Sequence, residues 1–481
     1  MVTKNKMIRG FTSILIITLM LQALGLSSLT VTAKSDTSSA VISNRYDVVV
    51  IGSEIQGVLL AKEARKQGLN VLILDPRSKP GGELIQGQMI VLDDVNDNSK
   101  RSLIQGEMKT LFSGYKSGSI RTSSDFDNYF NKLLQGIPIR SGIVIDSVQT
   151  ISLTKGKSLQ SLSYHLKDGT KYIAQSKYWV ENTDFNALTA KLNVKRIPGM
   201  ESLYNSKQAD YMAATYMLKF KNVEWAKLHQ AILNDYPLTN VAKKYGPNTY
   251  VDWHFATGFS NVTAKYTPHS SLLKLRGLNV TYQKDGQAII NALLLYDVNP
   301  ADSRSVQNAV AKGRAEAPYI LSFLQKNIPG FAKAQLNGFP DYLYIRDYNR
   351  YETKYVLDYP DLQNSRMFWD NVSVGGYSID LQGTRTIPTG VGFGKPDRYG
   401  LPLRSFELQS YDNVLVVGKN VGASIKAYGS ARIMPTTALA AQTIGIILGR
   451  EKNKRLVDLN AADFKRIHSY LEKDYKLILQ R

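Results

Sequence analysis

The chain has 481 residues, 43% of them hydrophobic and 21% charged, which is the balance of a folded chain and excludes extensive disorder. It contains no cysteine, which excludes disulfides, thiolate metal sites and a dithiol electron relay. The formal net charge of +20 favours contact with a polyanion such as a cell wall or an anionic membrane face, and a scattered basic surface that aids solubility is the alternative.

The N-terminal residues 1–33 have the layout of a secretory signal peptide. Three basic residues precede Gly10, residues 11–31 are apolar and uncharged, and small residues at 31–33 form a cleavage pattern. The apolar run is about long enough to span a bilayer, so an uncleaved anchor is the alternative. Both predict a secreted or cell-surface protein. Loss of the three basic residues lowers the net charge from +20 to +17.

A Ser/Thr-rich spacer over residues 34–44 follows the leader. Nucleic acid is not expected as a partner, because the sequence has no basic helix and no aromatic–basic motif, and because export argues against it.

A strand–turn–helix–strand unit opens the folded part of the chain. Residues 46–51 include a continuous β-branched run, as in a strand that is buried on both faces of a parallel sheet. The motif GSEIQG follows at residues 52–57, then a helical pattern that ends at Gly68 and a second apolar strand over residues 71–74. This order is typical of a Rossmann-type dinucleotide site.

The residues of this unit have distinct physical roles. Gly52 permits the tight turn, Gly57 lets helix and strand pack closely, and the free N–H groups at the helix start face the pyrophosphate. Asp75, 23 residues after Gly52, is placed to accept hydrogen bonds from ribose hydroxyls. Glu54 stands at the position of the middle glycine, and its carboxylate either points outward or impairs the site.

The segment after the second strand favours FAD over NAD. Pro76 and Arg77 follow Asp75 directly, and residues 81–83 read Gly-Gly-Glu. A glycine pair at this place suits close approach of the backbone to the ribityl-phosphate region of a flavin.

A second strand-to-helix unit near the C-terminus is expected to return to the same site. Residues 413–417 have a buried-strand pattern that ends in Gly418, and an Ala-rich helix begins near Pro435. The positive N-terminal end of that helix can stabilise negative charge on a reduced flavin. Arg432, just before it, adds to this effect, and a surface ion pair is its alternative role.

Several segments together resemble the FAD-dependent oxidoreductase family that is related to fumarate-reductase-type flavoproteins. They are residues 46–57, 80–87, 178–184, 343–350, 375–382 and 413–436. The resemblance implies FAD as the cofactor and a cap domain that covers the flavin. Non-covalent binding is expected because the sequence has no cysteine and no histidine lies in the Gly81–Gly82 segment. Three positions depart from the family pattern: Asp184 stands where the family has glycine, Gln382 where it has histidine, and Lys419 where it has arginine.

The predicted flavin contacts come from both ends of the chain. They are Gly52, Ser53, Glu54, Gly57, Asp75, Pro76, Arg77, Gly81, Gly82, Glu83, Thr183, Gly418, Lys419, Ser430, Arg432, Pro435 and Thr436.

We therefore predict an α/β fold with two packed domains, because the chain is too long for one ordinary core. A Rossmann-type FAD/NAD(P)-binding domain with a parallel sheet carries an inserted mixed α/β substrate domain. The boundaries are 45–192 and 371–450 for the FAD-binding domain, 193–370 for the substrate or cap domain, and 451–481 for a C-terminal helical segment. The elements expected in the cap are strands over residues 211–220 and 288–296 and an amphipathic helix over residues 305–326.

The catalytic candidates are few. His254 is matched to proton transfer near neutral pH, with a surface or structural histidine as the alternative. Arg346 and Arg350 could clamp a substrate carboxylate, with structural salt bridges as the alternative. Asp380 is expected to contact the flavin or an arginine.

Other kinds of chemistry find no support in the sequence. It shows no Ser/His/Asp triad, no metal-ligand spacing and no second nucleotide motif, so direct use of NAD(P)H is not expected. The glycines of residues 390–394 precede no helix and indicate a loop.

These observations predict an exported FAD-dependent oxidoreductase that transfers a hydride between a small organic substrate and flavin N5, with an unknown electron partner. Two alternatives remain open. One is an oxidase that acts on a wall-associated or anionic saccharide, which the positive net charge favours. The other is a surface binding protein that keeps the fold without catalysis, which the departures from the family pattern at Asp184, Gln382 and Lys419 favour.

Overall fold

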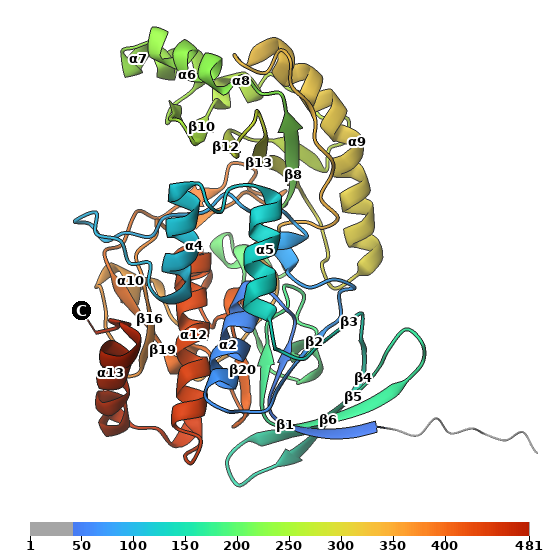
Figure 1. Ribbon diagram of the computed structural model, residues 1–481, viewed down its shortest axis with the longest axis vertical. Helices are drawn as coiled ribbons and strands as arrows, with labels where there is room; N and C mark the ends of the chain where they lie inside the picture. Colours follow the sequence, from blue (N-terminus) through green and yellow to red (C-terminus); the bar gives the residue numbers. More distant parts are fainter. Residues whose placement is uncertain (1–41, 481) are drawn as a thin grey trace, which may run out of the picture. The chain divides into compact units, whose positions relative to one another are not determined.

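The computed structural model describes residues 42–480, which form two seven-stranded sheets with their covering helices (Figure 1). The predicted leader, residues 1–33, and residues 34–41 of the predicted spacer lie outside the described residues. The last three spacer residues belong to the first strand, which begins at Ile42.

The first sheet has the strand order β3-β2-β1-β6-β5-β4, and β20 pairs with the end of β6. β1, β2, β3, β6 and β20 run parallel, as predicted, and β4 and β5 add an antiparallel extension that makes the sheet mixed. Its strands are β1 (Ile42–Ile51), β2 (Val71–Asp75), β3 (Ile139–Ser141), β4 (Val144–Ser152), β5 (Lys157–His165), β6 (Lys171–Glu181) and β20 (Val414–Val416).

The β-branched run of β1 is fully buried because both faces of the sheet are covered. Val48 and Val50 belong to the core that includes α2 (Ile55–Lys66) and α12 (Met434–Arg450). Val49 and Ile51 belong to a separate core on the opposite face. The sequence pattern of a strand buried on both sides is thus confirmed.

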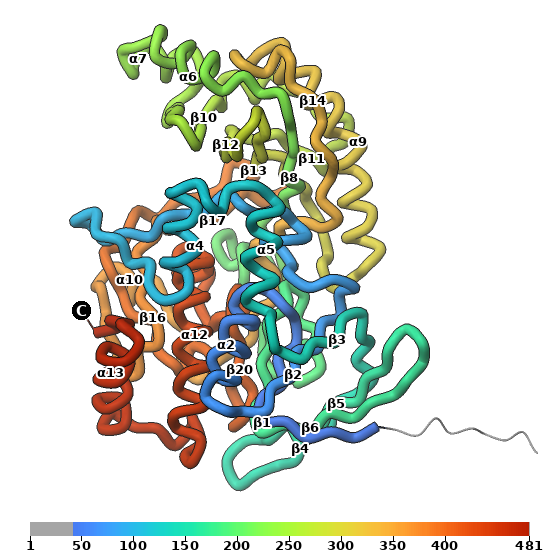
Figure 2. The backbone as a smooth tube through the Cα atoms, viewed as in Figure 1, coloured from blue at the N-terminus to red at the C-terminus, as the bar shows by residue number. Residues whose placement is uncertain are grey.

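The two ends of the described chain meet on this sheet. α12 packs beside α2, and Figure 2 shows the late, red segment against the early, blue one. A Cβ at Gly445 of α12 would lie 2.5 Å from the carbonyl oxygen of Leu60, so only glycine permits this approach. The pairing of β20 with β6 joins the same two segments through the backbone.

The second sheet has the order β14-β8-β13-β12-β10-β9, with β11 also on β13, and its pairings are antiparallel. Its strands are β8 (Ala214–Lys221), β9 (Tyr250–Val251), β10 (Phe255–Gly258), β11 (Leu273–Leu275), β12 (Leu278–Tyr282), β13 (Ala288–Leu295) and β14 (Gln335–Leu336). β13 is buried along its whole length because it lies between β8 and β12 and contacts the long helix α9 (Ser303–Asn327). The strands predicted over 211–220 and 288–296 and the helix predicted over 305–326 are confirmed to within a few residues.

The remaining elements connect or cover the two sheets. They are α3 (Gly82–Ile85), α4 (Gly106–Ser117), α5 (Ser123–Leu134), α6 (Trp225–Asn234), α7 (Leu238–Tyr245), α8 (Ser260–Thr263), α10 (Tyr359–Gln363), α11 (Ile425–Ala431), α13 (Ala461–Tyr475), β7 (Arg196–Ile197), β15 (Arg350–Tyr351), β16 (Asn371–Gly375), β17 (Asp380–Leu381), β18 (Val391–Gly392) and β19 (Tyr399–Pro402). β18 lies in the segment 390–394 that was expected to be a loop, and α13 lies in the segment 451–481 that was expected to be helical. Within residues 42–480 no single helix is long and apolar enough for a membrane span; only α11 and α12 taken together, bent by 83°, meet that criterion.

A partly buried ion pair closes the loop after β7. Glu201 accepts hydrogen bonds from Arg196 Nη1 at 2.6 Å, from the Gly199 N–H at 2.8 Å and from the Asp210 N–H at 3.1 Å. Burial opposes ionisation of this carboxyl, but Arg196 and the backbone donors outweigh it and lower the pKa of Glu201 from 4.5 to about 2.

We expect E201Q to lower the free energy of unfolding by about 2 kcal/mol at pH 7. A lowered carboxyl pKa stabilises the fold above the unfolded value of 4.5, and this stabilisation is lost as the pH falls toward 2. The difference between E201Q and the wild type should therefore shrink across that interval, measured by urea unfolding. The control is E352Q, in a more exposed pair with Lys195, which should change stability by less than about 0.5 kcal/mol. A difference that is constant with pH would contradict this account.

Candidate cofactor and substrate site

The turn after β1 requires its two glycines. Gly52 has a φ of +97°, and a Cβ there would lie 2.7 Å from the carbonyl group of Asn182. A Cβ at Gly57 would lie 2.3 Å from Asn182 Oδ1, which accepts a hydrogen bond of 2.7 Å from the Gly57 N–H. The close approach of α2 to the end of β6 depends on both glycines, which is the packing role predicted for Gly57.

Asp75, at the end of β2, is fully buried and bonded to protein donors. Its Oδ2 accepts hydrogen bonds from the Ser53 N–H at 3.0 Å and from the Ser53 hydroxyl. Its Oδ1 accepts from the Arg77 N–H at 2.8 Å and from Arg77 Nε at 3.2 Å. The Asp75 carboxylate, which was predicted to bind ribose hydroxyls, therefore binds the Ser53 turn and the Arg77 guanidinium. Pro76, which lies between Asp75 and Arg77 in the sequence, is partly buried.

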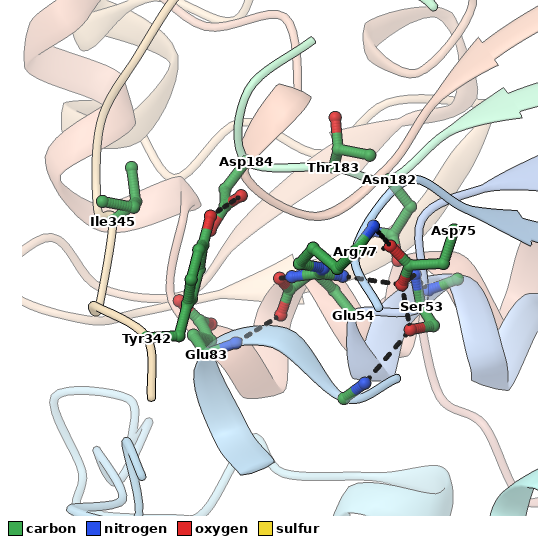
Figure 3. A network of polar contacts seen from close by, with 12 residues as sticks. Ser53, Glu54, Asp75, Arg77, Glu83, Asn182, Thr183, Asp184, Tyr342 and Ile345 are labelled. Atoms are coloured by element: carbon green, nitrogen blue, oxygen red, sulfur yellow. Dashed lines mark hydrogen bonds and ion pairs between the residues drawn. The ribbon is translucent and has the colours of Figure 1, made fainter. Parts of the chain in front are cut away.

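Glu54 turns its side chain into the molecule, so the outward orientation, one of the two alternatives for this residue, is wrong. Its carboxylate lies between Arg77 and the start of α3 (Figure 3), where it contacts Arg77 Nη1 and accepts a hydrogen bond of 3.0 Å from the Glu83 N–H. Burial opposes its ionisation, but Arg77 and Lys419 outweigh burial and lower the pKa of Glu54. These two attractions explain why the carboxylate turns inward.

The glycine pair lies against this carboxylate. Gly81 has a φ of +103° and precedes α3, and its N–H donates to the Ser53 hydroxyl at 3.1 Å. A Cβ at Gly82 would lie 1.8 Å from Glu54 Oε1 and 2.3 Å from Arg77 Nη1. The space that the absent side chain of Gly82 leaves open is therefore filled by the chain's own ion pair.

Two further buried carboxylates complete this polar network. Lys419 Nζ donates to Glu83 Oε2 and, at 2.6 Å, to the carbonyl oxygen of Ile345. Asp184 accepts a hydrogen bond of 2.9 Å from the Tyr342 hydroxyl, and its other oxygen lies 3.9 Å from Lys419 Nζ. Burial raises the pKa of both Glu83 and Asp184 against the opposing effect of Lys419.

We name the side chains of Glu54, Asp75, Arg77, Glu83, Asp184, Tyr342 and Lys419 the cradle network. Among these described side chains, four carboxylates face two cations. The network is therefore poorer in positive charge than the anion-binding loop that the sequence predicted.

Thr183 serves the turn after β6. Its hydroxyl donates to Glu181 Oε1 at 2.8 Å and accepts from the Ala187 N–H at 3.0 Å. Glu181 is fully buried and also accepts from the N–H groups of Leu188 and Thr189. Thr183 thus stabilises its own turn. Glu181 is a structural residue that the sequence analysis missed, and its signal was an acid directly after the apolar residues 178–180.

The residues near the C-terminus that were predicted to contact the flavin lie around the start of α12. Gly418 has a φ of +68°, and a Cβ there would lie 2.9 Å from the side-chain nitrogen of Asn182. Pro435 stands in the first turn of α12 as predicted. The Ser430 hydroxyl donates to the carbonyl oxygen of Tyr377 at 2.6 Å. Thr436 is buried, and its Oγ1 has no hydrogen-bond partner among residues 42–480.

Three arginines gather where the second sheet meets the start of α12. Arg276 follows β11, Arg346 precedes β15, and Arg432 lies between α11 and α12. All three interact electrostatically with Tyr344 and Asp380. We name Arg276, Arg346 and Arg432 the arginine cluster.

The donors of the arginine cluster are only partly used. Arg346 donates to the carbonyl oxygen of Ala213 and, at 2.6 Å, to the Thr215 hydroxyl, and burial lowers its pKa to about 10. Arg432 donates to the Tyr344 hydroxyl at 3.0 Å. The Nε atoms of Arg276 and Arg432 are buried and have no hydrogen-bond partner in the described part of the chain.

The other catalytic candidates do not join this cluster in the way predicted. Arg350 pairs with the buried Asp347 and lies over the Tyr428 ring, with its Cζ 3.8 Å from the ring centroid, so it has the structural role that was its alternative. His254 is exposed in the turn between β9 and β10 of the second sheet. Asp380 faces the arginines, and its carbonyl oxygen accepts from Arg432 at 3.3 Å.

A protein-family model for FAD-dependent oxidoreductases matches residues 47–467, most of the chain. The chain belongs to the FAD-dependent oxidoreductase family. The predicted family and the predicted α/β fold, a FAD-binding Rossmann domain with a second sheet domain, are thereby confirmed.

Solved structures similar to this family member share little sequence with it. A geranylgeranyl bacteriochlorophyll reductase-like protein from Thermoplasma acidophilum is 11% identical, with a TM-score of 0.37 over 90% of this chain and 84% of that one. A flavoprotein/dehydrogenase from Cytophaga hutchinsonii is 9% identical, with a TM-score of 0.37 over 90% and 84% of the two chains. The tetracycline destructase Tet(51) is 10% identical, with a TM-score of 0.38 over 91% and 90%. A search of curated proteins finds no significant match.

The FAD that the family implies fits one half of this site directly. The positive end of the 17-residue helix α12 and the unpartnered Thr436 Oγ1, both within residues 42–480, suit the polar edge of a flavin. In the other half, the Glu54 carboxylate fills the space beside Gly82. An anionic diphosphate fits there only after this carboxylate has moved away. Within the same residues no cluster of His, Asp and Glu could hold a metal ion.

Proposed function

We propose that this family member is an FAD-dependent oxidoreductase whose substrate is a small organic acid bound at the arginine cluster. Family membership supports the oxidoreductase activity and the cofactor. The single observation that supports the substrate class is the pair of buried Nε donors of Arg276 and Arg432 without an acceptor in the described chain. A buried N–H without an acceptor is costly, and a carboxylate supplies acceptor atoms with matching geometry.

The side chains around the cluster support binding and proton transfer. FAD, when bound, supplies hydride chemistry at N5. Arg432 and Arg276 would hold the carboxylate, while Arg346, fixed by Ala213 and Thr215, adds positive charge. The Tyr377 hydroxyl donates to Asp93 at 3.1 Å, and burial raises the pKa of Asp93. This pair can hold the proton that accompanies the hydride.

We further propose that the enzyme binds FAD non-covalently and works outside the cell. The absence of cysteine in the whole sequence supports the first point, and the signal-peptide pattern of residues 1–33 supports the second. The net charge of +20 is consistent with contact to an anionic wall or membrane surface.

The test is anaerobic bleaching of the flavin by a panel of small organic acids and by their amides. We expect bleaching by an acid and not by its amide. R276M should raise the KM for that acid by about 10- to 100-fold, because one charge-assisted donor is lost. R314M, at an exposed arginine of α9, is the control and should leave KM unchanged. Equal bleaching by acid and amide would refute the substrate class.

One observation favours a second candidate function, a binding protein without catalysis. The Glu54 carboxylate occupies the space beside Gly82 that the cofactor diphosphate requires. A wild-type chain that takes up no flavin at saturating FAD would favour this candidate over the enzyme.

A further inference from the structure

We propose that the Glu54 carboxylate competes with the diphosphate of FAD for the same donors and the same space, so that FAD binds only when this side chain swings out. The inference rests on the proposed function, because it concerns uptake of the cofactor of that same site. It assigns to one side chain of this chain the control of cofactor affinity.

The argument from space starts at Gly82. A Cβ at this position would meet Glu54 Oε1 at 1.8 Å, Glu54 Cδ at 2.2 Å and Arg77 Nη1 at 2.3 Å. The Glu54–Arg77 ion pair therefore fills the space that a side chain at position 82 would occupy. A phosphate group that approaches the Gly81–Gly82 backbone must displace the carboxylate.

The argument from donors leads to the same conclusion. The Glu54 carboxylate accepts hydrogen bonds from Arg77 Nη1 and from the Glu83 N–H at the start of α3. A guanidinium and a free backbone N–H are groups that bind phosphate oxygens. The side chain is 3% exposed, so it satisfies these donors from within the protein. FAD binding is then an exchange of one anion for another.

The argument from charge sets the direction of the effect. Asp75, Glu83 and Asp184 remain in the cradle network whether or not Glu54 is present. With Glu54 in place, a diphosphate adds negative charge to a region where four described carboxylates already face two cations. Without it, Arg77 Nη1 loses its anionic partner and can pair with phosphate, while Nε and Nη2 stay bonded to Asp75.

Protonation does not relieve this competition near neutral pH. Arg77 and Lys419 lower the pKa of Glu54 despite its burial, so the carboxylate stays charged. Displacement must come from movement of the side chain or from its replacement.

The experiment compares the cofactor-stripped wild type with E54G, which restores glycine to the middle position of the motif, and with E54Q, which removes the charge and keeps the size. The matched control is E63Q, at a buried glutamate on the same helix, whose carboxylate instead contacts Lys66 and Gln442. FAD affinity is measured by quenching of flavin fluorescence and by calorimetry, and ADP is titrated as a probe of the diphosphate half. Thermal unfolding without cofactor checks that each variant folds. If E54G does not fold, the comparison of E54Q with the wild type is the test.

We expect E54G and E54Q to bind FAD and ADP at least about tenfold more tightly than the wild type, and E63Q to match the wild type. Wild-type affinity equal to or greater than that of both variants would overturn the inference and leave the proposed function standing. Binding by the variants with none by the wild type at saturating FAD would uphold the inference and overturn the proposed function. Failure of every folded protein to bind FAD would overturn both.

Discussion

Replacing Lys419 with methionine is expected to lower the free energy of unfolding by about 3–5 kcal/mol at pH 7, because it leaves buried carboxylates without their cation. Lys419 Nζ contacts Glu83 and lies 3.9 Å from Asp184, and both side chains are buried. Burial already raises the pKa of Glu83 above 4.5, and Lys419 opposes that rise. Removal of the lysine therefore raises this pKa further.

The loss of stability in K419M should depend on pH. A carboxyl whose pKa is raised in the folded state stabilises the fold below the unfolded value of 4.5 and loses that contribution as the pH rises through the folded value. The deficit of K419M should thus be small near pH 4 and grow toward pH 7, measured by urea unfolding across this interval. K419R is the control, since it keeps the charge and restores the residue of the family pattern. A K419M deficit that is independent of pH would contradict the electrostatic explanation.

Replacing Arg350 with methionine is expected to cost about 3–5 kcal/mol of stability, because Asp347 would remain buried without its partner. Arg350 and Asp347 have side-chain exposures of 1% and 0%, and Arg350 also lies over the Tyr428 ring. The measurement is equilibrium unfolding in urea at pH 7.

The double variant R350M/D347N is the control for this pair. It removes both charges and should recover at least about 2 kcal/mol relative to R350M, since no unpaired charge stays in the core. If R350M binds a substrate acid more weakly but unfolds like the wild type, the clamp role first predicted for Arg350 is right and the structural role is wrong.

The first strand–turn–helix–strand unit could be predicted because its information is local. The β-branched run before Gly52, the two glycines of the turn and the apolar run before Asp75 each dictate a backbone conformation that neighbouring residues do not oppose. The same holds for α9, whose amphipathic pattern extends over a 25-residue helix, and for β13, a continuous run of mostly apolar residues that is buried at every position.

The orientation of Glu54 could not be predicted, because it depends on groups that arrive from other segments. Arg77 follows β2, the Glu83 N–H opens α3, and Lys419 follows β20. The carboxylate turns inward only because all three converge on it, and no spacing in the sequence reports that convergence. Arg276 escaped prediction for the same reason, since its cluster joins two sheets.

His254 and Arg350 show a different limit of sequence reasoning. A histidine suits proton transfer and an arginine suits a carboxylate by chemistry alone, but chemistry does not say where the residue lies. His254 lies exposed on the second sheet, and Arg350 is enclosed with Asp347. The fold thus places His254 away from the arginine cluster and gives Arg350 an ion-pair partner in Asp347.

The meeting of α12 with α2 also governs how the molecule assembles. The side chains of Gln56 and Thr437, which hydrogen-bond at 3.1 Å, are 381 positions apart in the chain. Contacts of such sequence separation form late and slow the folding rate. As the chain is synthesised, the face of α2 that packs against α12 stays uncovered until residues 434–450 have followed it. Strand β20 also joins the first sheet only at this late stage. We therefore expect the uncovered apolar face of α2 to be prone to aggregation until α12 arrives.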